Sequence, residues 1–599
     1  MNGLFLFLCG KINYMKIHKL IALFIPLLVT SCGITPSSSS VDTSSQEELS
    51  SSEQKTTSET VSFSSSVSSS TSSSAVSSST VSSSSVSSSS SQEVQPMRHD
   101  PVTTTIYPLT SSDKTLKNGR VEISPVFTGT PQSFTASFTG NNIRIDEIGG
   151  KQYITALKAG TTTKVTLNSS GGLTCDFNVK VSNSTYTATS ARDGKFASSE
   201  GWFTSTSVSE ISAMPSNFMN GIDISTCKAL YQNGTNFYNK DGVEQSLFYI
   251  LKDAGVNWIR LKLWVDPYTS TGVSYGGGES DLPNTLWMAY EAKKAGLNLL
   301  LDFHYSDYWT HPGQQILPKS WNSCNSKEAL CAKIKSYTTE TLTTFKTNGC
   351  LPDMVQLGNE ISSGIYLQKY SGSSESLDSY GQPSYLTGKS SYSYGTNNAA
   401  QYTDYIKAAA EGVNAVDSSI KKVIHWAKGS TISAAVINNF FNNMPSSYYD
   451  YAAISFYPYY CFDSLSAAQT ILSGLSLSKP WFVAETAYPF SGSSYVWENN
   501  KDVTNFTISD WTTSGITTIK NEYAFTPNGQ ANLIHDLTAS VVASGGKGVF
   551  YWEGAWVPNL NVGWAGAGSL NTYGNQGFFS YDGKALANLD LFKQMSPHI

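Results

Sequence analysis

Two glutamates are placed in this sequence so that they could act as a pair on one bond. Glu360 ends the run Met354-Val-Gln-Leu-Gly-Asn-Glu360, and Glu485 ends the run Trp481-Phe-Val-Ala-Glu485. Enzymes that cleave a glycosidic bond with retention use one carboxyl group as acid/base and another as nucleophile, roughly 5–5.5 Å apart. If both apolar runs are parallel strands of a (β/α)8 barrel, their carboxyl ends face one mouth, where that fold carries its reactions. The long separation along the chain is then no obstacle.

The elements that must position these glutamates are readable from about residue 217 onward. Apolar runs there alternate with segments of helical periodicity, which indicates βα units. The runs predict eight strands, at residues 221–224, 258–263, 299–303, 354–357, 422–425, 452–455, 481–483 and 548–551. Helices are predicted between them, among others at residues 243–254, 286–295, 327–347 and 400–416.

We therefore expect an α/β fold, a (β/α)8 TIM barrel over residues 217–599. Its longest loops follow the fourth and seventh strands. Residues 362–396, rich in Ser, Tyr and Gly, are placed to shape a substrate groove.

Polar or aromatic residues stand at the ends of seven of these eight runs. They are Asp223, Arg260, His304, Asn359 with Glu360, Tyr457, Glu485, and Trp552 with Glu553. A single Asp or Arg at a strand end is often part of a structural ion pair, so the inference rests on the set rather than on any one member.

Several longer motifs resemble one known family. They are Gly221-Ile-Asp-Ile-Ser, Gly255-Val-Asn-Trp-Ile-Arg-Leu-Lys-Leu-Trp264, Leu301-Asp-Phe-His-Tyr-Ser-Asp307, Gln356-Leu-Gly-Asn-Glu360, Ser455-Phe-Tyr-Pro458, Glu485-Thr-Ala-Tyr488 and Tyr551-Trp-Glu553. In this order they resemble glycoside hydrolase family 53, the endo-β-1,4-galactanases of clan A, over nearly all of residues 217–595. The Asn-Glu pair alone would indicate only the clan.

The resemblance implies that Glu360 is the acid/base and Glu485 the nucleophile. The two roles need different pKa values, which neighbouring groups can create in paired carboxylates. Arg260 beside Glu485 would keep the nucleophile charged, and Tyr457 could donate a hydrogen bond to the same carboxylate. Asn359 could bind the sugar 2-hydroxyl. The alternative for Glu360 is a helix N-terminal acid after a Gly-Asn turn.

Flat aromatic rings near the strand ends could stack on the apolar face of a galactose unit. The candidates are Trp264, Tyr305, Trp309, Trp321, Tyr459, Trp552 and Trp556. Trp552, at the end of the eighth strand, is the leading choice for a platform at the cleavage site, while core packing explains the others equally well. His304 is open between substrate binding, orientation of a catalytic partner, and an ordinary buried imidazole.

The chain departs from the family pattern at several places. Tyr-Trp-Glu-Pro is here Tyr551-Trp-Glu-Gly554, Ser-Tyr-Tyr-Pro is Ser455-Phe-Tyr-Pro458, and residues 571–576 replace a Trp-Glu-Asn-Gln-like segment. Some bacterial members hold a structural Ca2+ after the eighth strand, but residues 558–574 contain no Asp or Glu. Because a hard cation usually takes carboxylate ligands, we expect no Ca2+ and no other cofactor or metal; metal retained after exhaustive dialysis would overturn this.

The N-terminus predicts export and a lipid anchor. Lys16 and Lys19 precede the apolar run 20–29, which is short for a membrane span, and Val29-Thr-Ser-Cys32 resembles a bacterial lipobox with Cys32 as the lipidated residue. Met15 is then the expected true start, with 1–32 as the signal peptide. The alternative is a cleaved secretory signal with a chance cysteine. Residues 33–98, overwhelmingly Ser, predict a disordered tether.

Between tether and barrel, residues 99–185 alternate polar and apolar positions in short Thr/Val/Ile runs separated by Gly/Asn turns. This pattern predicts a small β-sandwich that loosely resembles a bacterial immunoglobulin-like domain of group 2. Residues 186–216 are expected to be a linker. Nothing in the sandwich suggests catalysis.

Composition limits the partners. The 599 residues carry a formal net charge of −6, which disfavours nucleic acid because phosphate binding needs clustered Lys and Arg. The eight cysteines show no metal-binding spacing, and Cys324 with Cys331 is the nearest pair for a disulfide, although free thiols are equally consistent.

We expect a monomeric cell-surface lipoprotein, anchored to the membrane outside the cell, that acts on β-1,4-galactan side chains of pectin. The rivals are another clan A endoglycanase, a mannanase or xylanase, and a surface protein that binds polysaccharide without cutting it.

Overall fold

The computed structural model describes the second of two compact units, residues 92–599, in part. The described residues are 96–99, 103–106, 120–128, 130–148, 151–157, 159–160, 162–182, 201–233, 235–269, 274–370, 389–396, 399–427, 433–458, 464–498, 501–507, 519, 521–559, 562–563 and 573–598. The predicted signal peptide, Cys32 and nearly all of the predicted tether lie outside them.

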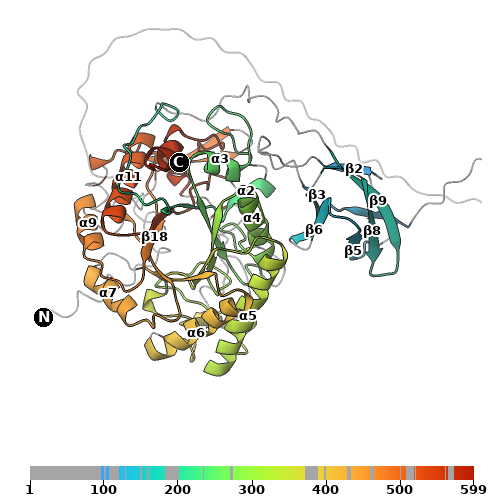
Figure 1. Cartoon of the computed structure of the whole chain (residues 1–599), viewed down its shortest axis with the longest axis horizontal. Helices are drawn as coiled ribbons and strands as arrows, with labels where there is room; N and C mark the ends of the chain where they lie inside the picture. Colours follow the sequence, from blue (N-terminus) through green and yellow to red (C-terminus); the bar gives the residue numbers. More distant parts are fainter. Residues whose placement is uncertain are drawn as a thin grey trace, which may run out of the picture. The chain divides into compact units, whose positions relative to one another are not determined.

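Eight parallel strands close into a barrel, which confirms the predicted TIM fold (Figure 1). In barrel order they are β10 (Met219–Asp223), β11 (Trp258–Leu263), β12 (Asn298–Phe303), β13 (Met354–Leu357), β16 (Lys421–Trp426), β17 (Tyr451–Ser455), β18 (Trp481–Thr486) and β21 (Gly548–Tyr551). The strands read as continuous apolar runs because both their faces are buried, one by the barrel interior and one by helices. All six residues of β18 are buried, for example.

The barrel interior alternates with a period of two along each strand. Near the strand starts, a separate apolar cluster fills it, with Met219, Trp258, Leu300, Met354, Val423, Ala453, Phe482 and Phe550 among its members. Continuing the alternation toward the carboxyl ends brings polar side chains onto the same inward face. The closed apolar layer below therefore leaves one polar end for chemistry.

Helices lie between the strands and cover the barrel. The main ones are α2 (Cys227–Gln232), α3 (Leu247–Asp253), α4 (Leu282–Lys294), α5 (Lys327–Thr347), α6 (Ala399–Val416), α7 (Ala434–Asn442), α9 (Leu465–Ser473) and α11 (Pro527–Ala543), with short α12 (Leu591–Gln594) near the end. N-cap side chains fix several starts: Ser326 accepts from the Ala329 amide at α5, and Asp281 accepts from the Asn284 amide at α4. Among the described helices, none combines the length and apolar character that a bilayer span requires.

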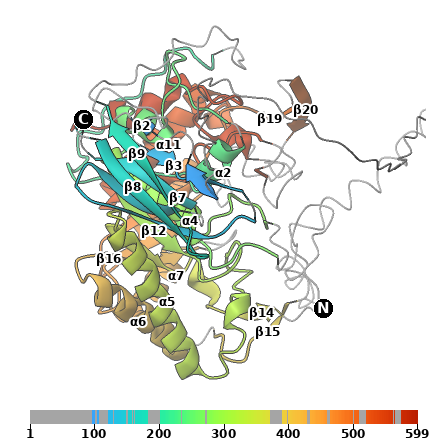
Figure 2. The ribbon, with the colours of Figure 1, turned by 90° about the vertical axis from the view of Figure 1, so that its right-hand side faces the viewer.

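The two longest strand-to-helix connections follow β13 and β18, as predicted. The first contains the hairpin β14 (Gln368–Tyr370) with β15 (Lys389–Ser391), and the second contains β19 (Ser493–Glu498) with β20 (Lys501–Thr507). Both hairpins project on the same side of the barrel in Figure 2.

The segment before the barrel folds as two small sheets around one core. One sheet has the order β2 (Thr103–Ile106), β9 (Thr174–Val181), β8 (Thr162–Ser169), β5 (Phe134–Phe138), and the other has β3 (Arg120–Glu122), β7 (Lys151–Ala156), β6 (Ile143–Ile148). A further pair joins β1 (Met97–His99) to β4 (Pro125–Phe127). Burial alternates strictly along most of β8, so every second side chain enters the core that includes Ile154, Val165 and Phe177.

Of the segment predicted to be a linker, residues 186–216, the structure describes residues 201–216. Trp202 packs against Phe490 and Tyr581, and Ile211 donates its amide to the Met595 carbonyl. This half of the segment is therefore part of the barrel's own packing, because its apolar residues find partners near the C-terminus. Among the described cysteines, Cys175, Cys227, Cys324 and Cys331 are free thiols, and the Cys350 thiol donates to the Phe345 carbonyl at 3.6 Å.

Candidate active site

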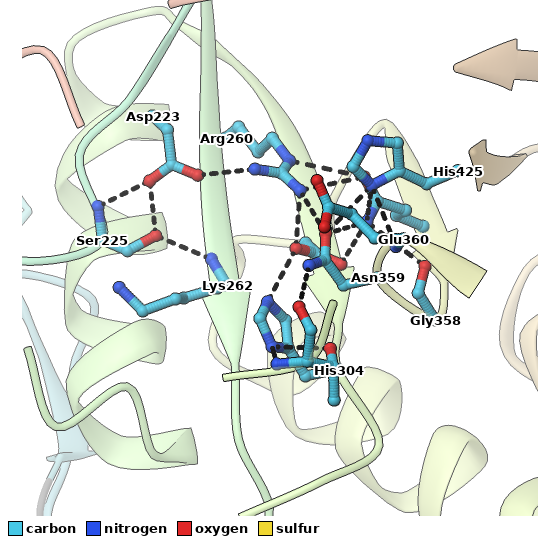
Figure 3. A network of polar contacts seen from close by, with 12 residues as sticks. Asp223, Ser225, Arg260, Lys262, His304, Gly358, Asn359, Glu360 and His425 are labelled. Atoms are coloured by element: carbon cyan, nitrogen blue, oxygen red, sulfur yellow. Dashed lines mark hydrogen bonds and ion pairs between the residues drawn. The ribbon is translucent and has the colours of Figure 1, made fainter. Parts of the chain in front are cut away.

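Arg260 is the centre of the polar network at the carboxyl ends of the strands (Figure 3). It is fully buried on β11, and its guanidinium forms ion pairs with Asp223 at 3.0 Å, Asp302 at 2.7 Å and Glu485 at 2.8 Å. Nη2 also donates to Asn359 Oδ1 at 2.9 Å. Burial opposes the charge on Arg260, but the three carboxylates outweigh it and raise its pKa further. Arg260 is thus a permanent cation that holds residues from several strands.

Asp223 is committed to this network. Its Oδ1 accepts from the amide and the hydroxyl of Ser225, at 2.9 and 2.6 Å, while Oδ2 accepts from Arg260. The side chain is buried, so it supports Arg260 and does not reach toward a ligand.

Glu485 lies inside β18, with both carboxylate oxygens bound. Arg260 holds Oε1, and the Tyr457 hydroxyl donates to Oε2 at 3.0 Å. Strict alternation from Phe482 places Ala484 inside the barrel, where it joins the inner apolar cluster, and would turn Glu485 away. A register irregularity against β17, where Ile454 pairs with Val483 but Ser455 with Glu485, brings Glu485 to the inward side as well. The extra residue re-aims the side chain, which is a known use of β-bulges next to active sites.

Glu360 follows β13 in a left-handed backbone conformation, with φ 52° and ψ 48°. Gly358, two residues earlier, has φ 92°, and a Cβ there would meet Ile361 at 2.8 Å. The Glu360 carboxyl accepts a 2.6 Å hydrogen bond from Ser455 Oγ. A non-glycine residue at positive φ costs on the order of 1–3 kcal/mol, and such strain clusters at functional sites.

The carboxyl groups of Glu360 and Glu485 lie close together. An oxygen of Glu360 and an oxygen of Glu485 lie within 4.8 Å of each other, as does a ring nitrogen of His425. Burial, then the charge of Glu485, raises the pKa of Glu360 to about 8. Burial also raises the pKa of Glu485, to about 7, with Arg260 and the Tyr457 hydrogen bond opposing. Glu360 is therefore the group of the pair that keeps its proton longer.

Glu360, His425 and Glu485 are also the one set of three potential metal ligands found within the described ranges. Both ring nitrogens of His425 already have hydrogen-bonding partners, and Arg260 neutralises Glu485. A cation would have to compete with that guanidinium, so these residues fit a proton-transfer pair better than a metal centre.

His304 belongs to the support of Arg260. Its Nε2 lies 3.1 Å from Asp302 Oδ2, and its Nδ1 accepts from the indole N–H of Trp264 at 3.1 Å. With both nitrogens engaged and the ring buried, His304 is a hydrogen-bonded imidazole that supports Asp302, and a role in binding substrate or in orienting a catalytic partner stays a prediction. The amide of Asn359 accepts from Arg260 and donates to the Thr310 carbonyl at 2.8 Å.

Burial separates the aromatic candidates. Trp264, Tyr305, Trp321 and Trp556 are 0–2 % exposed and belong to the core. Tyr459 lies outside the described residues. Trp552 is partly exposed, and its ring lies 6.1 Å from that of Trp309, which is 8 % exposed. Lys262 Nζ lies 4.3 Å from the Trp309 ring centre and forms an ion pair with Glu553 at 2.9 Å. A buried ion pair therefore packs against the Trp309 ring of this aromatic pair.

Several members of the network were not singled out from sequence: Lys262, Asp302, Gln356, His425 and Ser455. The fifth strand was the one run without an assigned strand-end residue, yet His425 from that strand joins the network through Asn359 and Ser455. Most of these residues sit two positions after a member of the inner apolar layer, as Asp302 after Leu300 and His425 after Val423. Moving two residues along each strand, from the inner apolar residue toward the carboxyl end, would have identified them.

Comparisons with known proteins point to one family of glycoside hydrolases. The sequence model of glycosyl hydrolase family 53 matches residues 219–592. The chain is 29% identical over 424 residues to an endo-beta-1,4-galactanase of Bacillus subtilis, covering 64% of this chain and 88% of that protein. It is 29% identical to an arabinogalactan endo-beta-1,4-galactanase of Thermothelomyces thermophilus, covering 63% and 98%. Among solved structures, it resembles the GH53 catalytic domain of Ignisphaera aggregans, with 32% identity, a TM-score of 0.54, and coverage of 65% of this chain and 99% of that one.

Proposed function

The chain belongs to glycosyl hydrolase family 53, and from that membership we propose that it is an endo-β-1,4-galactanase that cleaves galactan and the type I arabinogalactan side chains of pectin with retention. The observation that carries the proposal is the approach of Glu360 and Glu485 to within 4.8 Å at the polar end of the barrel. Relatives named for galactan hydrolysis support the substrate.

Retention is supported by that short approach. Retaining glycosidases hold their carboxyl groups roughly 5–5.5 Å apart, whereas inverting enzymes need roughly 6.5–9.5 Å to admit a water. In the proposed first step, Glu485 bonds to the anomeric carbon while the leaving oxygen takes the proton of Glu360. In the second, Glu360 takes a proton from water as the water oxygen displaces Glu485.

The surrounding groups support this division of roles. Arg260 and the Tyr457 hydroxyl stabilise the carboxylate form of Glu485, which a nucleophile needs. Glu360 has no cation in direct contact among the described residues, and its Oε1 accepts from a neutral hydroxyl. We propose that Asn359, held by Arg260 and Thr310, presents an amide hydrogen to the sugar 2-hydroxyl, and that Trp552 with Trp309 forms the platform for the sugar face.

The carboxyl pair predicts a bell-shaped pH dependence of kcat/KM. Activity should fall at low pH as Glu485 becomes protonated, and at high pH as Glu360 loses its proton. Since the two groups titrate as a coupled pair with pKa values of about 7 and about 8, we expect the optimum between these values. Initial rates on galactan from pH 5 to 10, with stability checked at each pH, measure it. A rate that rises steadily to pH 10 would contradict the assignment of Glu360.

Reducing-sugar release from linear galactan, mannan and xylan tests the substrate. We expect rapid release from galactan, with oligosaccharides appearing before galactose, and little from the other two polymers. Activity on mannan or xylan alone would favour another clan A endoglycanase. Binding of galactan without release of reducing ends would favour a surface polysaccharide-binding protein.

We also propose the cellular location of the enzyme, the role of its first domain and its oligomeric state. The lipobox-like Val29-Thr-Ser-Cys32 and the Ser-rich stretch behind it support a lipid anchor on Cys32 and a cell-surface location, where a polymer too large to enter the cell can be met. The two small sheets around a shared core support an immunoglobulin-like spacer. We propose that the enzyme acts as a monomer, since the site draws all its described groups from one barrel.

A further inference from the structure

A hydrogen-bonded chain from two neighbouring strands ends on the carboxyl group of Glu360. Ser455, the last residue of β17, donates its hydroxyl to Glu360 Oε1 at 2.6 Å. His425, on β16, places Nε2 at 2.9 Å from the same hydroxyl oxygen. His425 is 0 % exposed and Ser455 6 % exposed, so water does not compete for these contacts. Figure 3 shows the imidazole against Glu360 and Asn359.

The surroundings of His425 determine where its single proton lies. Burial, then the charge of Arg260, lowers its pKa well below the usual value, so the ring is neutral. The amide N–H of Glu360 points at Nδ1 from 3.3 Å, which makes Nδ1 an acceptor. Asn359 Oδ1 also lies 2.9 Å from Nδ1, but it already accepts from Arg260 and Gln356 and does not require the ring proton. We therefore assign the proton to Nε2.

This tautomer fixes the direction of the chain. Nε2–H donates to Ser455 Oγ, which leaves the serine hydroxyl proton for Glu360 Oε1 alone. Oε1 is thereby occupied, and Oε2 remains as the oxygen of Glu360 that can exchange a proton with a ligand.

We propose that Ser455 and His425 are positioning residues of the acid/base, which hold Glu360 by Oε1 so that Oε2 carries the transferred proton in both steps. This inference rests on the proposed function. When Oε2–H protonates the leaving oxygen, the electrons of the cleaved bond stay with that oxygen. When water attacks, Oε2 takes the water's proton. The Ser455 hydroxyl donates to Oε1 throughout and need not move.

The same hydrogen bond adjusts the acidity of Glu360. The charged groups facing it are Glu485 on β18, Arg260 on β11 and Asp302 on β12, with neutral His425 on β16. Burial, Glu485 and Asp302 favour the protonated acid, whereas the Ser455 hydroxyl and Arg260 favour the carboxylate. Removing the hydroxyl should therefore raise the pKa of Glu360 further, which keeps the carboxyl protonated to higher pH but makes it a weaker proton donor, and it also leaves the carboxyl free to rotate.

The test compares two leaving groups in Ser455→Ala. On galactan, whose sugar leaving group needs a proton, we expect kcat/KM to fall about 10–100-fold, within the contribution of general acid catalysis. On 2,4-dinitrophenyl β-galactobioside, whose leaving group needs none, kcat/KM should change less than about threefold. The alkaline limb of the galactan pH profile should move to higher pH. Ser455→Thr, which keeps the hydroxyl, should recover most of the activity on galactan. The kcat/KM of His425→Gln on galactan should be higher than that of His425→Phe, because Gln can still donate to Ser455.

Ser225→Ala is the matched control, because Ser225 Oγ also donates at 2.6 Å to a buried carboxylate, that of Asp223. Ser225→Ala should change kcat/KM on both substrates by the same factor, and it should not move the alkaline limb of the galactan pH profile. The proposal is overturned if Ser455→Ala lowers kcat/KM equally on both substrates, or if its alkaline limb does not move while thermal unfolding shows a folded protein. Failure of the wild-type chain to cleave galactan would instead overturn the proposed function.

Discussion

Replacing Glu485 by Ala is expected to lower kcat/KM on galactan on the order of 10⁶-fold, the scale of loss seen when an enzyme loses its nucleophile. Without a carboxylate on that side of the sugar, no covalent intermediate forms. The space that the side chain leaves, beside Arg260 and Tyr457, can admit a small anion. With azide and dinitrophenyl β-galactobioside, we expect rescue and a glycosyl azide of α configuration, because azide attacks from the face that Glu485 occupied.

Two comparisons make this result specific. Glu360→Ala with azide should give the β-glycosyl azide, since azide then enters on the opposite face after the intermediate has formed. Glu411→Ala removes a partly exposed glutamate of α6 that pairs with Lys335, and it should leave kcat/KM unchanged. An α-azide product from the Glu360 variant would mean that the two roles are reversed.

Replacing Arg260 by Met is expected to destabilise the barrel by about 3–5 kcal/mol, because it leaves Asp223, Asp302 and Glu485 buried without their cation. Every one of the 13 tryptophans lies at or after residue 202, so denaturant unfolding followed by Trp fluorescence reports on the barrel and not on the sandwich. Activity should be lost as well, because Glu485 would hold its proton more tightly.

The cost should depend on pH. In the wild type, burial raises the pKa of Asp302, but Arg260 and His304 outweigh it and the net shift is downward, so Asp302 contributes stability above its unfolded pKa. In Arg260→Met the buried carboxyls lose their cation, so their pKa values in the folded state lie above those in the unfolded state. The folded state is then destabilised as the pH rises from the unfolded-state pKa toward the folded-state pKa, because these carboxyls must ionise without a partner. The loss should thus be larger at pH 8 than at pH 5. Lys335→Met, which breaks an exposed pair, should show neither effect. Equal losses at both pH values would contradict a buried charge network.

Regular elements were predictable where local pattern and burial agree. The strands 258–263, 354–357 and 548–551 and the helix 327–347 match the structure residue for residue. The helix predicted at 286–295 begins instead at Leu282, because Asp281 caps it and Pro283 fits its first turn. The helix predicted at 243–254 begins at Leu247, since Glu244 bridges to Tyr238 instead.

The site was predictable only in part. Residues that follow an apolar run, such as Glu360, stand out in sequence. Asp302 and His425 lie inside their strands, and whether they face the barrel interior depends on register, which only the closed sheet defines. The bulge that turns Glu485 inward is likewise a property of strand pairing, not of the sequence Trp481-Phe-Val-Ala-Glu485 itself.

The most direct test of a two-glutamate double displacement is to trap the intermediate. An activated 2-deoxy-2-fluoro β-galactobioside slows both steps through its electron-withdrawing fluorine, while the good leaving group keeps the first step fast enough for the intermediate to accumulate. Peptide mapping by mass spectrometry should find one fluoroglycosyl group per chain, esterified to Glu485. A label on any other carboxylate, or full turnover without a label and with release of the α anomer, would contradict the account.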